Sequence, residues 1–324
     1  MSPIPSPQSS ASPISAPRVT VIMIVRDGER FIEEALQSVC AQTMHAWEVL
    51  VVDDGSRDGT VDIVGQFIKR DSTRFFLLQH PAGICRGMSA SRNLGLKHAR
   101  GELITFLDHD DVMSAEKLDR QCKLLDQHPD VAAVIGPNIR WYSWDQSSHG
   151  ADHAARVDHQ QDLGIAASDA GLVVTPPSLL PIFLERTEAT PQAPMVRADA
   201  IRAVGGFEEA FRDMYEDQVF LAKLLLTNSI VVSNESWQCY RQHSESCVHR
   251  AHREGRHQRA RRRFLAWLDA YILDRLAQTD RDDARHEMLQ SIRALIRRAW
   301  WKSLATSVRA ALRVRFRRRP RVRA

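Results

Sequence analysis

Short runs of β-branched and aliphatic residues alternate with longer amphipathic segments in the first half of the chain. Val19–Val25 (VTVIMIV) and Glu48–Asp53 (EVLVVD) each have the length and composition of a buried parallel strand. Between them, apolar residues recur at helical spacing from Phe31 to Cys40, and Asp27 is expected to cap this helix. Together the three segments predict a βαβ unit.

The same alternation continues to about residue 136. It predicts helices at Thr60–Lys69, Ser89–Ala99 and Ala115–Gln127, and strands at Phe75–Gln79, Leu103–Leu107 and Val131–Gly136. Strands separated by single helices form an α/β fold, a doubly wound and mostly parallel sheet with helices on both faces. Ligands of such sheets bind at the carboxyl ends of the strands. The loops that follow the strands are therefore where functional residues are expected.

The second half of the chain is less regular. From Ser143 to about Pro194 no period is visible, and we expect an irregular stretch. Order is predicted to return with Ala198–Val204, a helix at Glu216–Leu226, a strand at Ile230–Ser233 and helices from Arg250 onward. Residues 1–17, rich in proline and serine, are expected to form a disordered leader.

Composition narrows the class of protein. The five cysteines are an odd set without a CxxC pair, which argues against a disulfide framework and against a thiolate zinc site. The leader lacks the basic and apolar regions of a signal peptide, and no apolar run approaches the roughly 20 residues that span a bilayer. These features predict a cytoplasmic protein.

Positive charge is concentrated at the end of the chain. The net charge is +4, but the last 34 residues hold twelve Lys and Arg and no acid, so the rest carries −8. Apolar residues recur there at helical spacing: Leu289, Ile292, Leu295, Ile296, Trp300, Leu304, Val308, Leu312 and Phe316. Such a helix either packs on its own protein or lies on an anionic membrane surface, where each basic residue contributes about 1 kcal/mol. Nucleic acid is not expected as a partner.

Acidic residues follow two of the predicted strands. Asp53-Asp54-Gly55-Ser56 closes the second strand and suits a glycine turn with a helix cap, but a carboxylate there can also accept the N–H of a nucleobase. Asp108 and Asp110 follow a later strand, where alternation would put them on one face and His109 on the other. Paired carboxylates select Mg²⁺ or Mn²⁺ and leave coordination positions for diphosphate oxygens. Asp111 instead suits a cap for the helix that follows.

A third acidic pair, Glu216-Asp217, opens an apolar helix in the second half. Acids in a first turn favour the helix dipole, and this alone would explain them. The functional interpretation is a general base that accepts the proton of an acceptor hydroxyl. The residues themselves leave both interpretations open.

Five segments, taken in order, resemble family 2 glycosyltransferases of the GT-A fold. They are VTVIMIVRDGERFIEEALQSVCAQT, EVLVVDDGSRDGT, SASRNLGLKHARGELITFLDHDD, GGFEEAF with YEDQVFLAKLLL, and YRQHSES. The resemblance runs from about Arg18 to Cys247 and implies a GT-A domain over 18–247. It would have a nucleotide-binding half over 18–140, an acceptor half over 141–247, and a basic helical extension over 248–324.

The resemblance also implies roles for individual residues. Asp54, with Asp53, would hold the nucleotide base, and the neighbouring strand end with Val25 and Asp27 would face the nucleotide sugar, as would Arg92. Asp108 and Asp110 match the metal site for Mn²⁺ or Mg²⁺, with Asp108 also facing the donor. The remaining matches are Asp217 as catalytic base, Glu216 beside it, and His243 at the metal or diphosphate.

The implied function is metal-dependent, inverting transfer of a sugar from a nucleotide diphosphate sugar to a glycan or lipid-linked hydroxyl, in cell-surface polysaccharide synthesis. Arg26 and Asp27 stand where the family usually has tyrosine and asparagine, so nucleotide contacts there are expected to differ. Two alternatives remain, a nucleotidyltransferase that makes nucleotide sugars and a non-catalytic module that binds them. A dinucleotide-dependent dehydrogenase would need GxGxxG where this chain has VRDGER.

Overall fold

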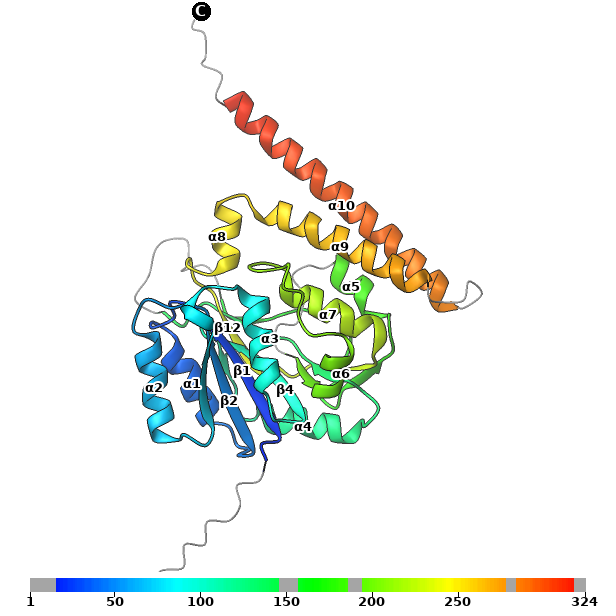
Figure 1. Ribbon diagram of the computed structural model, residues 1–324. Coiled ribbons are helices and arrows are strands. Elements are labelled where there is room, and N and C mark those ends of the chain that lie inside the picture. Colours follow the sequence, from blue (N-terminus) through cyan, green and yellow to red (C-terminus); the bar gives the residue numbers. More distant parts are fainter. Residues whose placement is uncertain (1–15, 146–156, 186–193, 278–283, 318–324) are drawn as a thin grey trace, which may run out of the picture.

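The computed structural model describes residues 16–145, 157–185, 194–277 and 284–317, with side chains of the last helix up to Ser307. A sheet of eight strands in the order β3-β2-β1-β4-β10-β6-β11-β9 runs through the centre (Figure 1). Its strands are β1 (Val19–Val25), β2 (Trp47–Asp53), β3 (Phe75–Gln79), β4 (Leu103–Asp108), β6 (Ala133–Ile135), β9 (Leu172–Val174), β10 (Met195–Arg197) and β11 (Ile230–Val232).

The first four strands of this sheet are parallel, and β10 and β9 run against their neighbours. A smaller sheet has the order β5-β12-β7-β8, formed by β5 (Val112–Met113), β12 (Gln238–Arg241), β7 (Ile139–Trp141) and β8 (His159–Gln160). The doubly wound, mostly parallel sheet predicted from the sequence is therefore confirmed.

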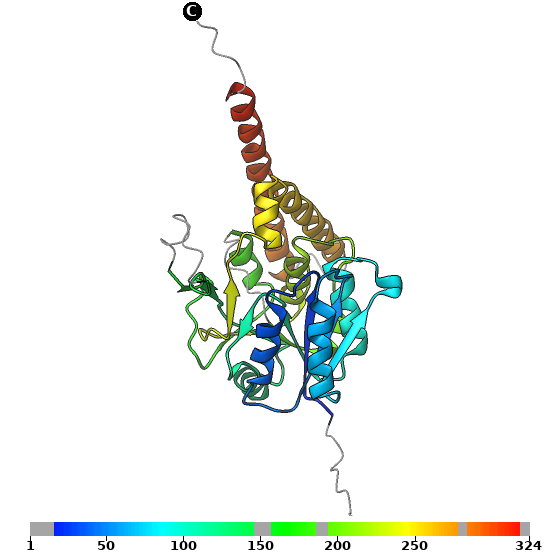
Figure 2. The ribbon, with the colours of Figure 1, turned by 90° about the vertical axis from the view of Figure 1, so that its left-hand side faces the viewer.

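Helices cover both faces of the large sheet. They are α1 (Ile32–Cys40), α2 (Thr60–Arg70), α3 (Met88–His98), α4 (Lys117–Gln127), α5 (Leu179–Glu185), α6 (Ala198–Ala203), α7 (Glu216–Thr227), α8 (Cys247–Arg253), α9 (His257–Ala277) and α10 (Ala284–Arg317). Side chains alternate along β1, so that Val21 and Met23 join a core with α1, α2 and α4, whereas Ile22 and Ile24 join a core with α7 and α9. Figure 2 looks onto α1 and α2, with α8 above the strands.

Two expectations for local structure are wrong. The stretch from 143 to 194 contains β8, β9 and α5, and β9 forms the edge of the large sheet, because its pairing with β11 supplies order that no local period signals. Asp27 does not cap α1, whose N-cap is Phe31. Instead Asp27 takes a left-handed φ of 52°, and its carboxylate accepts the Arg57 N–H at 2.8 Å in the loop after β2.

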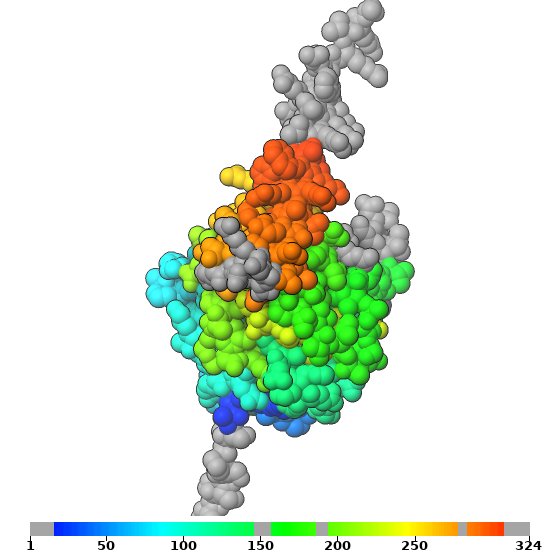
Figure 3. Space-filling model, turned by 90° about the vertical axis from the view of Figure 1, so that its right-hand side faces the viewer, coloured from blue at the N-terminus to red at the C-terminus, as the bar shows by residue number. Residues whose placement is uncertain are grey.

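The C-terminal helices pack on the domain and on each other. In α10, Leu289, Ile292 and Ile296 are buried, and Arg293 pairs with Asp269 of α9 at 2.8 Å. The first part of α10 lies against the body and the helix then projects beyond it (Figure 3). Self-packing is thus confirmed for the first part of the apolar stripe, whereas the side chains of Val308, Leu312 and Phe316 lie outside the described residues.

Two further expectations concern the rest of the chain. All five cysteines, which lie in described segments, are free thiols, as predicted. None of the described helices combines the length and apolarity that crossing a membrane requires. The leader expected over residues 1–17 lies almost entirely outside the described residues.

Candidate functional site

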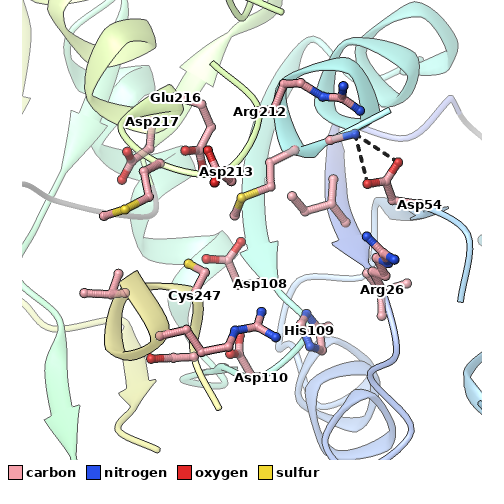
Figure 4. Close-up of a pocket in the computed structure, with 18 of the residues that line it drawn as sticks. Arg26, Asp54, Asp108, His109, Asp110, Arg212, Asp213, Glu216, Asp217 and Cys247 are labelled. Atoms are coloured by element: carbon pink, nitrogen blue, oxygen red, sulfur yellow. Dashed lines mark hydrogen bonds between the residues drawn. The ribbon is translucent and has the colours of Figure 1, made fainter. Parts of the chain in front are cut away.

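A cavity of about 1320 Å³ opens at the carboxyl ends of β1, β2 and β4, between the start of α7 and α8. Segments from both halves of the chain line it, as the close-up in Figure 4 shows. The predicted residues that it brings together are Val25, Asp27, Asp54, Arg92, Asp108, Asp110, Glu216, Asp217 and His243. The parallel strands deliver the first of these to one edge, as expected for this fold.

Asp53 is the predicted residue that does not line the cavity. Its side chain is 1% exposed and accepts the backbone N–H of Ser56 at 3.0 Å and the amide of Gln79 at 2.9 Å. Because both oxygens serve the turn and the neighbouring strand, Asp53 shapes the loop and does not present a carboxylate to a ligand. The expectation that it shares base binding with Asp54 is corrected accordingly.

Asp54 lies at one end of the cavity in a cradle of donors. Its carboxylate accepts the backbone N–H groups of Arg86 at 2.6 Å and Gly87 at 3.0 Å, and the thiol of Cys85 at 3.0 Å. Gly55 beside it has φ 86°, and a Cβ there would lie 2.7 Å from the Gly83 carbonyl oxygen. The turn therefore requires glycine, and it fixes the direction of the Asp54 side chain.

Two arginines, Arg26 and Arg212, flank Asp54. Nothing in the sequence identified them as a pair. Arg26 directs its guanidinium to the Cys85 sulfur at 3.1 Å. Arg212, from the loop before α7, donates to the carbonyls of Cys85 at 3.0 Å and Arg86 at 3.1 Å. The two cations give this end of the cavity a positive rim, as expected where a phosphate-bearing ligand enters. Arg212 stands in a loop without a motif, so only its place in the fold identifies it.

The acids at the end of β4 do not follow strand alternation. The chain turns after Asp108, with the Asp111 N–H bonded to the Asp108 carbonyl at 3.1 Å, so extended geometry stops there. His109 lines the same cavity as Asp108 and Asp110, and the expectation that it points away is wrong. Asp110 meets the imidazole Nε2 of His243 at 2.9 Å. This pair joins the loop after β4 to the segment that follows β12 in the second half.

Asp110 and His243 form the best place for a divalent cation. Burial opposes ionisation of Asp110, yet the hydrogen bond with His243 and the nearby His109 hold its pKa below the ordinary value. The other ring nitrogen of His243, Nδ1, is buried without a hydrogen-bond partner in the described residues. One carboxylate and one imidazole suit Mn²⁺ or Mg²⁺ if diphosphate oxygens complete the shell. Among the described residues no group of three or more such ligands occurs, so these residues alone do not form a closed metal site.

Arg92 joins Asp108 at the end of β4 to Glu216 at the start of α7. Its buried guanidinium donates to Glu216 at 2.8 Å and to Asp108 at 3.0 Å, and it lies over the ring of Phe207 at 5.4 Å. Burial would lower the pKa of Arg92, but the charges of Asp108 and Glu216 raise it, so it stays a cation. A buried Arg between two carboxylates fixes the position of each.

Asp217 is the carboxylate best prepared to accept a proton. Burial, followed by the charge of Glu216, raises its pKa to about 7. Within the described part of the chain its side chain receives one hydrogen bond, from the Gln218 N–H at 2.7 Å. A carboxylate with a pKa near neutrality that faces a cavity has the properties of a general base.

Tyr215, just before this pair, has a backbone conformation that is rare for a bulky residue. Its φ of 67° and ψ of 9° are left-handed, which costs about 1–3 kcal/mol unless surrounding structure imposes it. The side chain is 5% exposed and stacks on Phe264 of α9 at 5.3 Å. Sequence patterns give no warning of such strain.

A buried polar network supports the loop that carries Asp108 and Asp110. Asp111 is fully buried and accepts the amide of Gln238 and the N–H of Arg241, both at 2.9 Å, so it does not cap α4 as the sequence suggested. Lys117 donates to Gln238 at 2.9 Å, and burial lowers its pKa to about 7. Burial and the charge of Asp110 raise the pKa of Asp111 well above its usual value. The network joins β5, α4 and β12 behind the cavity.

In a comparison with known protein families, residues 20–167 match the family described as glycosyl transferase family 2. The chain is similar to the putative glycosyltransferase EpsE of Bacillus subtilis, with 35% identity over 114 residues, 35% of this chain and 40% of that protein. It is also similar to the putative teichuronic acid biosynthesis glycosyltransferase TuaG of B. subtilis, with 34% identity over 34% of this chain and 42% of that protein. The chain thus spans less than half the length of these relatives.

Solved structures show the same fold over most of the chain. S. aureus TarS 1-349 in complex with UDP-GlcNAc superposes with a TM-score of 0.65 at 20% identity, covering 88% of this chain and 73% of that one. The mannosyltransferase PcManGT from Pyrobaculum calidifontis, in complex with GDP-Man and Mn²⁺, gives a TM-score of 0.56 at 18% identity, covering 95% and 79%. The chain therefore has the GT-A fold, as the resemblance implied.

Proposed function

Because residues 20–167 belong to glycosyl transferase family 2, we propose that the protein transfers a sugar from a nucleotide diphosphate sugar to an acceptor hydroxyl. The observation that carries the proposal is the convergence of Asp54, Asp110 and Asp217 on one cavity at the strand ends. Each has a different environment, and the three environments match the three tasks of the reaction: holding the nucleotide, neutralising the diphosphate and accepting a proton.

The donor nucleotide lies at the Asp54 end. Two backbone N–H groups and the Cys85 thiol occupy three of the roughly four positions at which a carboxylate accepts hydrogen bonds, so Asp54 keeps one position for the base N–H. The strand end with Val25 and Asp27 borders the same space. Arg26 and Arg212 stand at the rim, where they attract the diphosphate, so the nucleotide contacts here differ from those of family members with a tyrosine at position 26.

The sugar diphosphate extends from there toward Asp110. Asp110 and His243, with Asp108 beside them, would hold Mn²⁺ or Mg²⁺, and such an ion supplies Lewis-acid neutralisation of the leaving diphosphate. Arg92 holds Asp108 and Glu216 in place from behind. Support for a metal also comes from PcManGT, whose structure contains Mn²⁺.

Asp217 acts as the base. A single in-line displacement puts the acceptor hydroxyl on the face of the sugar opposite the leaving diphosphate, so the anomeric carbon inverts. As the new C–O bond forms and the bond to the diphosphate breaks, the hydroxyl proton passes to Asp217. A pKa of about 7 leaves a substantial part of Asp217 ionised at neutral pH and still basic enough to accept that proton. Glu216 raises this pKa and is itself fixed by Arg92.

The division of the chain follows from these roles. Residues 18–140 form the nucleotide-binding half, residues 141–247 the acceptor half, and residues 248–324 the helical extension. The acceptor is a glycan or a lipid-linked hydroxyl in cell-surface polysaccharide synthesis, a setting supported by the name of TuaG, a relative assigned to teichuronic acid biosynthesis. Free cysteines fit a cytoplasmic enzyme.

The extension also provides a surface for an anionic membrane. Trp301 of α10 is 65% exposed and has Arg297, Arg298 and Lys302 close to it in the helix, and Leu273 of α9 is 51% exposed. A basic surface with exposed Trp and Leu suits the headgroup region of a bilayer. Co-sedimentation with vesicles of anionic lipid at low and high salt tests this, and failure to bind at low salt would exclude it.

The reaction is tested by incubating the protein with UDP-, GDP- and dTDP-sugars, with and without Mn²⁺. Stabilisation against heat by one nucleotide series identifies the donor, because a ligand that binds only the folded state raises the melting temperature. Release of the nucleoside diphosphate that depends on Mn²⁺ supports a transferase. Formation of a nucleotide sugar from a sugar phosphate would indicate a nucleotidyltransferase instead, and binding without turnover would indicate a non-catalytic module.

A further inference from the structure

We infer that α9 of the helical extension completes the active site: His257 and Phe264 are positioning residues that act on Asp217 through Tyr215. The inference rests on the proposed function, since it concerns the base of that reaction. It goes beyond that function because α9 lies about 90 residues past the end of the region that matches the family. It assigns the extension a part in catalysis in addition to any part in docking.

Tyr215 is held from the α9 side by two separate contacts. Its hydroxyl lies 3.2 Å from Nε2 of His257, and its ring stacks on Phe264 with the ring planes 18° apart. His257 is in turn stacked on His252 of α8 at 4.1 Å. Tyr215, His252 and His257 all line the cavity, so this contact stands at the edge of the site itself.

The whole loop before α7 is fastened to the extension, and Tyr215 is only one of its attachment points. Arg263 of α9 donates to the Ala210 carbonyl at 2.8 Å, and Trp267 meets the ring of Phe211 edge-on at 6.0 Å. Arg256, just before α9, pairs with Asp213 at 3.0 Å. Contacts at 210, 211, 213 and 215 leave the loop little freedom to choose another path into α7.

This fastening matters because the left-handed turn at Tyr215 sets the direction of the next two residues. A non-glycine residue stays in that conformation only where its surroundings enforce it, and for Tyr215 the enforcing groups come from α9. Glu216 has an anchor of its own in Arg92 at 2.8 Å. Asp217 has no comparable partner in the described part of the chain, so its position depends on the backbone on either side of it.

The test compares single variants in α9 that differ in contact with Tyr215. His257→Ala removes the partner of the hydroxyl, and His257→Gln restores a polar group of similar reach. Gln258→Ala is the matched control: Oε1 of Gln258 accepts the Ser303 hydroxyl of α10 at 2.7 Å, so this side chain belongs to the α9–α10 contact. Melting temperature, donor affinity, kcat and the pH dependence of transfer are measured for each.

We expect His257→Ala to lower kcat for transfer by about 10- to 100-fold, the range for a displaced catalytic group, with donor affinity within twofold of the wild type. In this variant the pH at which the transfer rate falls on the acidic side should lie below 7, because a displaced Asp217 is better solvated and its pKa is lower. His257→Gln should recover much of kcat, and Gln258→Ala should keep it. Full kcat in His257→Ala, or a loss shared equally by Gln258→Ala, would overturn the inference.

A second variant keeps the test decisive if His257→Ala folds poorly. Tyr215→Phe deletes the hydroxyl alone and retains the ring on Phe264, so it should fold and lose kcat in the same direction by a smaller factor. Unchanged kcat and pH profile in a folded Tyr215→Phe would also count against the inference. Absence of transfer in the wild type with every donor would contradict the proposed function instead, so the two failures are distinct.

Discussion

The two ends of the cavity hold carboxylates of opposite design. Asp54 sits in a cradle of two backbone N–H groups and a thiol, on a turn that needs a glycine. Asp217 has one backbone donor, a like-charged neighbour and a strained residue before it. A carboxylate whose oxygens already accept hydrogen bonds is thus a fixed hydrogen-bond acceptor, whereas a desolvated carboxylate without such bonds is prepared to accept a proton.

The loop from 208 to 215 connects the two ends. Arg212 reaches the carbonyls of Cys85 and Arg86 next to Asp54, and three residues later Tyr215 leads into Asp217. A ligand that orders Arg212 at the donor end would therefore bear on the base at the other end.

Replacing Asp217, the proposed base, should have the largest effect. Asp217→Asn keeps the shape but cannot accept a proton at neutral pH, so kcat for transfer should fall by about 10²- to 10⁴-fold. Donor affinity, measured by calorimetry, should stay within twofold, because the Asp54 end is untouched. Normal turnover in this variant would show that the base is another residue.

Removal of the donor cradle should act on binding. Asp54→Ala leaves the Arg86 and Gly87 N–H groups without their acceptor, which costs about 1–3 kcal/mol of stability, and donor affinity should fall about 10- to 100-fold. Asp53→Asn is the matched control, since Asp53 is buried in the same turn but does not line the cavity. It should lower the melting temperature and leave the affinity of the folded protein unchanged. Equal losses of affinity in both variants would mean that Asp54 only supports the turn.

The pH dependence should differ between the two ends. Asp217 must be ionised to act, and its pKa is about 7, so kcat/KM should be flat above pH 7 and fall about tenfold for each unit below it. The pKa of Asp217 in the folded protein lies above the ordinary 3.8, so the free energy of unfolding should fall as the pH rises from about 4 to 7. Asp217→Asn should remove this pH dependence of stability. Donor binding should show no step near pH 7. A transfer rate that stays flat to pH 5 would contradict this assignment.

The smallest effect is expected for the turn glycine. In Gly55→Ala the new Cβ would clash with the Gly83 carbonyl oxygen, and alanine would have to adopt a φ of 86°. The variant should therefore lose about 1 kcal/mol or more of stability and bind the donor a few-fold more weakly. Gly65→Ala in α2 has open space around it and should gain roughly 0.4–1 kcal/mol. Thermal unfolding with and without nucleotide measures both. A tolerated Gly55→Ala would show that the turn adapts more readily than its geometry suggests.

The parts of the fold that sequence predicts well are those set by local pattern. Strands β1 to β4 and helices α1 to α4 match their predicted ranges within two residues, because buried parallel strands and amphipathic helices each carry their own period. β9 and α5 were missed, since β9 is ordered by pairing with β11 and its three residues give no period. The packing of the first part of α10 on the domain could not be predicted either, because the same apolar stripe would also suit a membrane surface.

The candidate site divides in the same way. Acids at strand ends were found because the fold directs them to one edge, and the resemblance added Arg92 and His243 at a distance in sequence. Tyr215, Arg212 and Lys117 were not identified, and Asp111 was assigned to a helix cap, because strain, loop paths and burial of charge depend on contacts across the chain. The prediction that His109 points away from Asp108 and Asp110 was wrong because the chain turns directly after Asp108.

A crystal structure of the protein with a nucleotide diphosphate sugar and Mn²⁺ would show directly how the cavity holds its ligands. We expect the nucleoside against Asp54 and the diphosphate beside a cation held by Asp110 and His243, with the anomeric carbon in reach of a hydroxyl that faces Asp217. A diphosphate bound elsewhere in the protein, with no cation at Asp110, would show that the proposed roles of these residues are wrong.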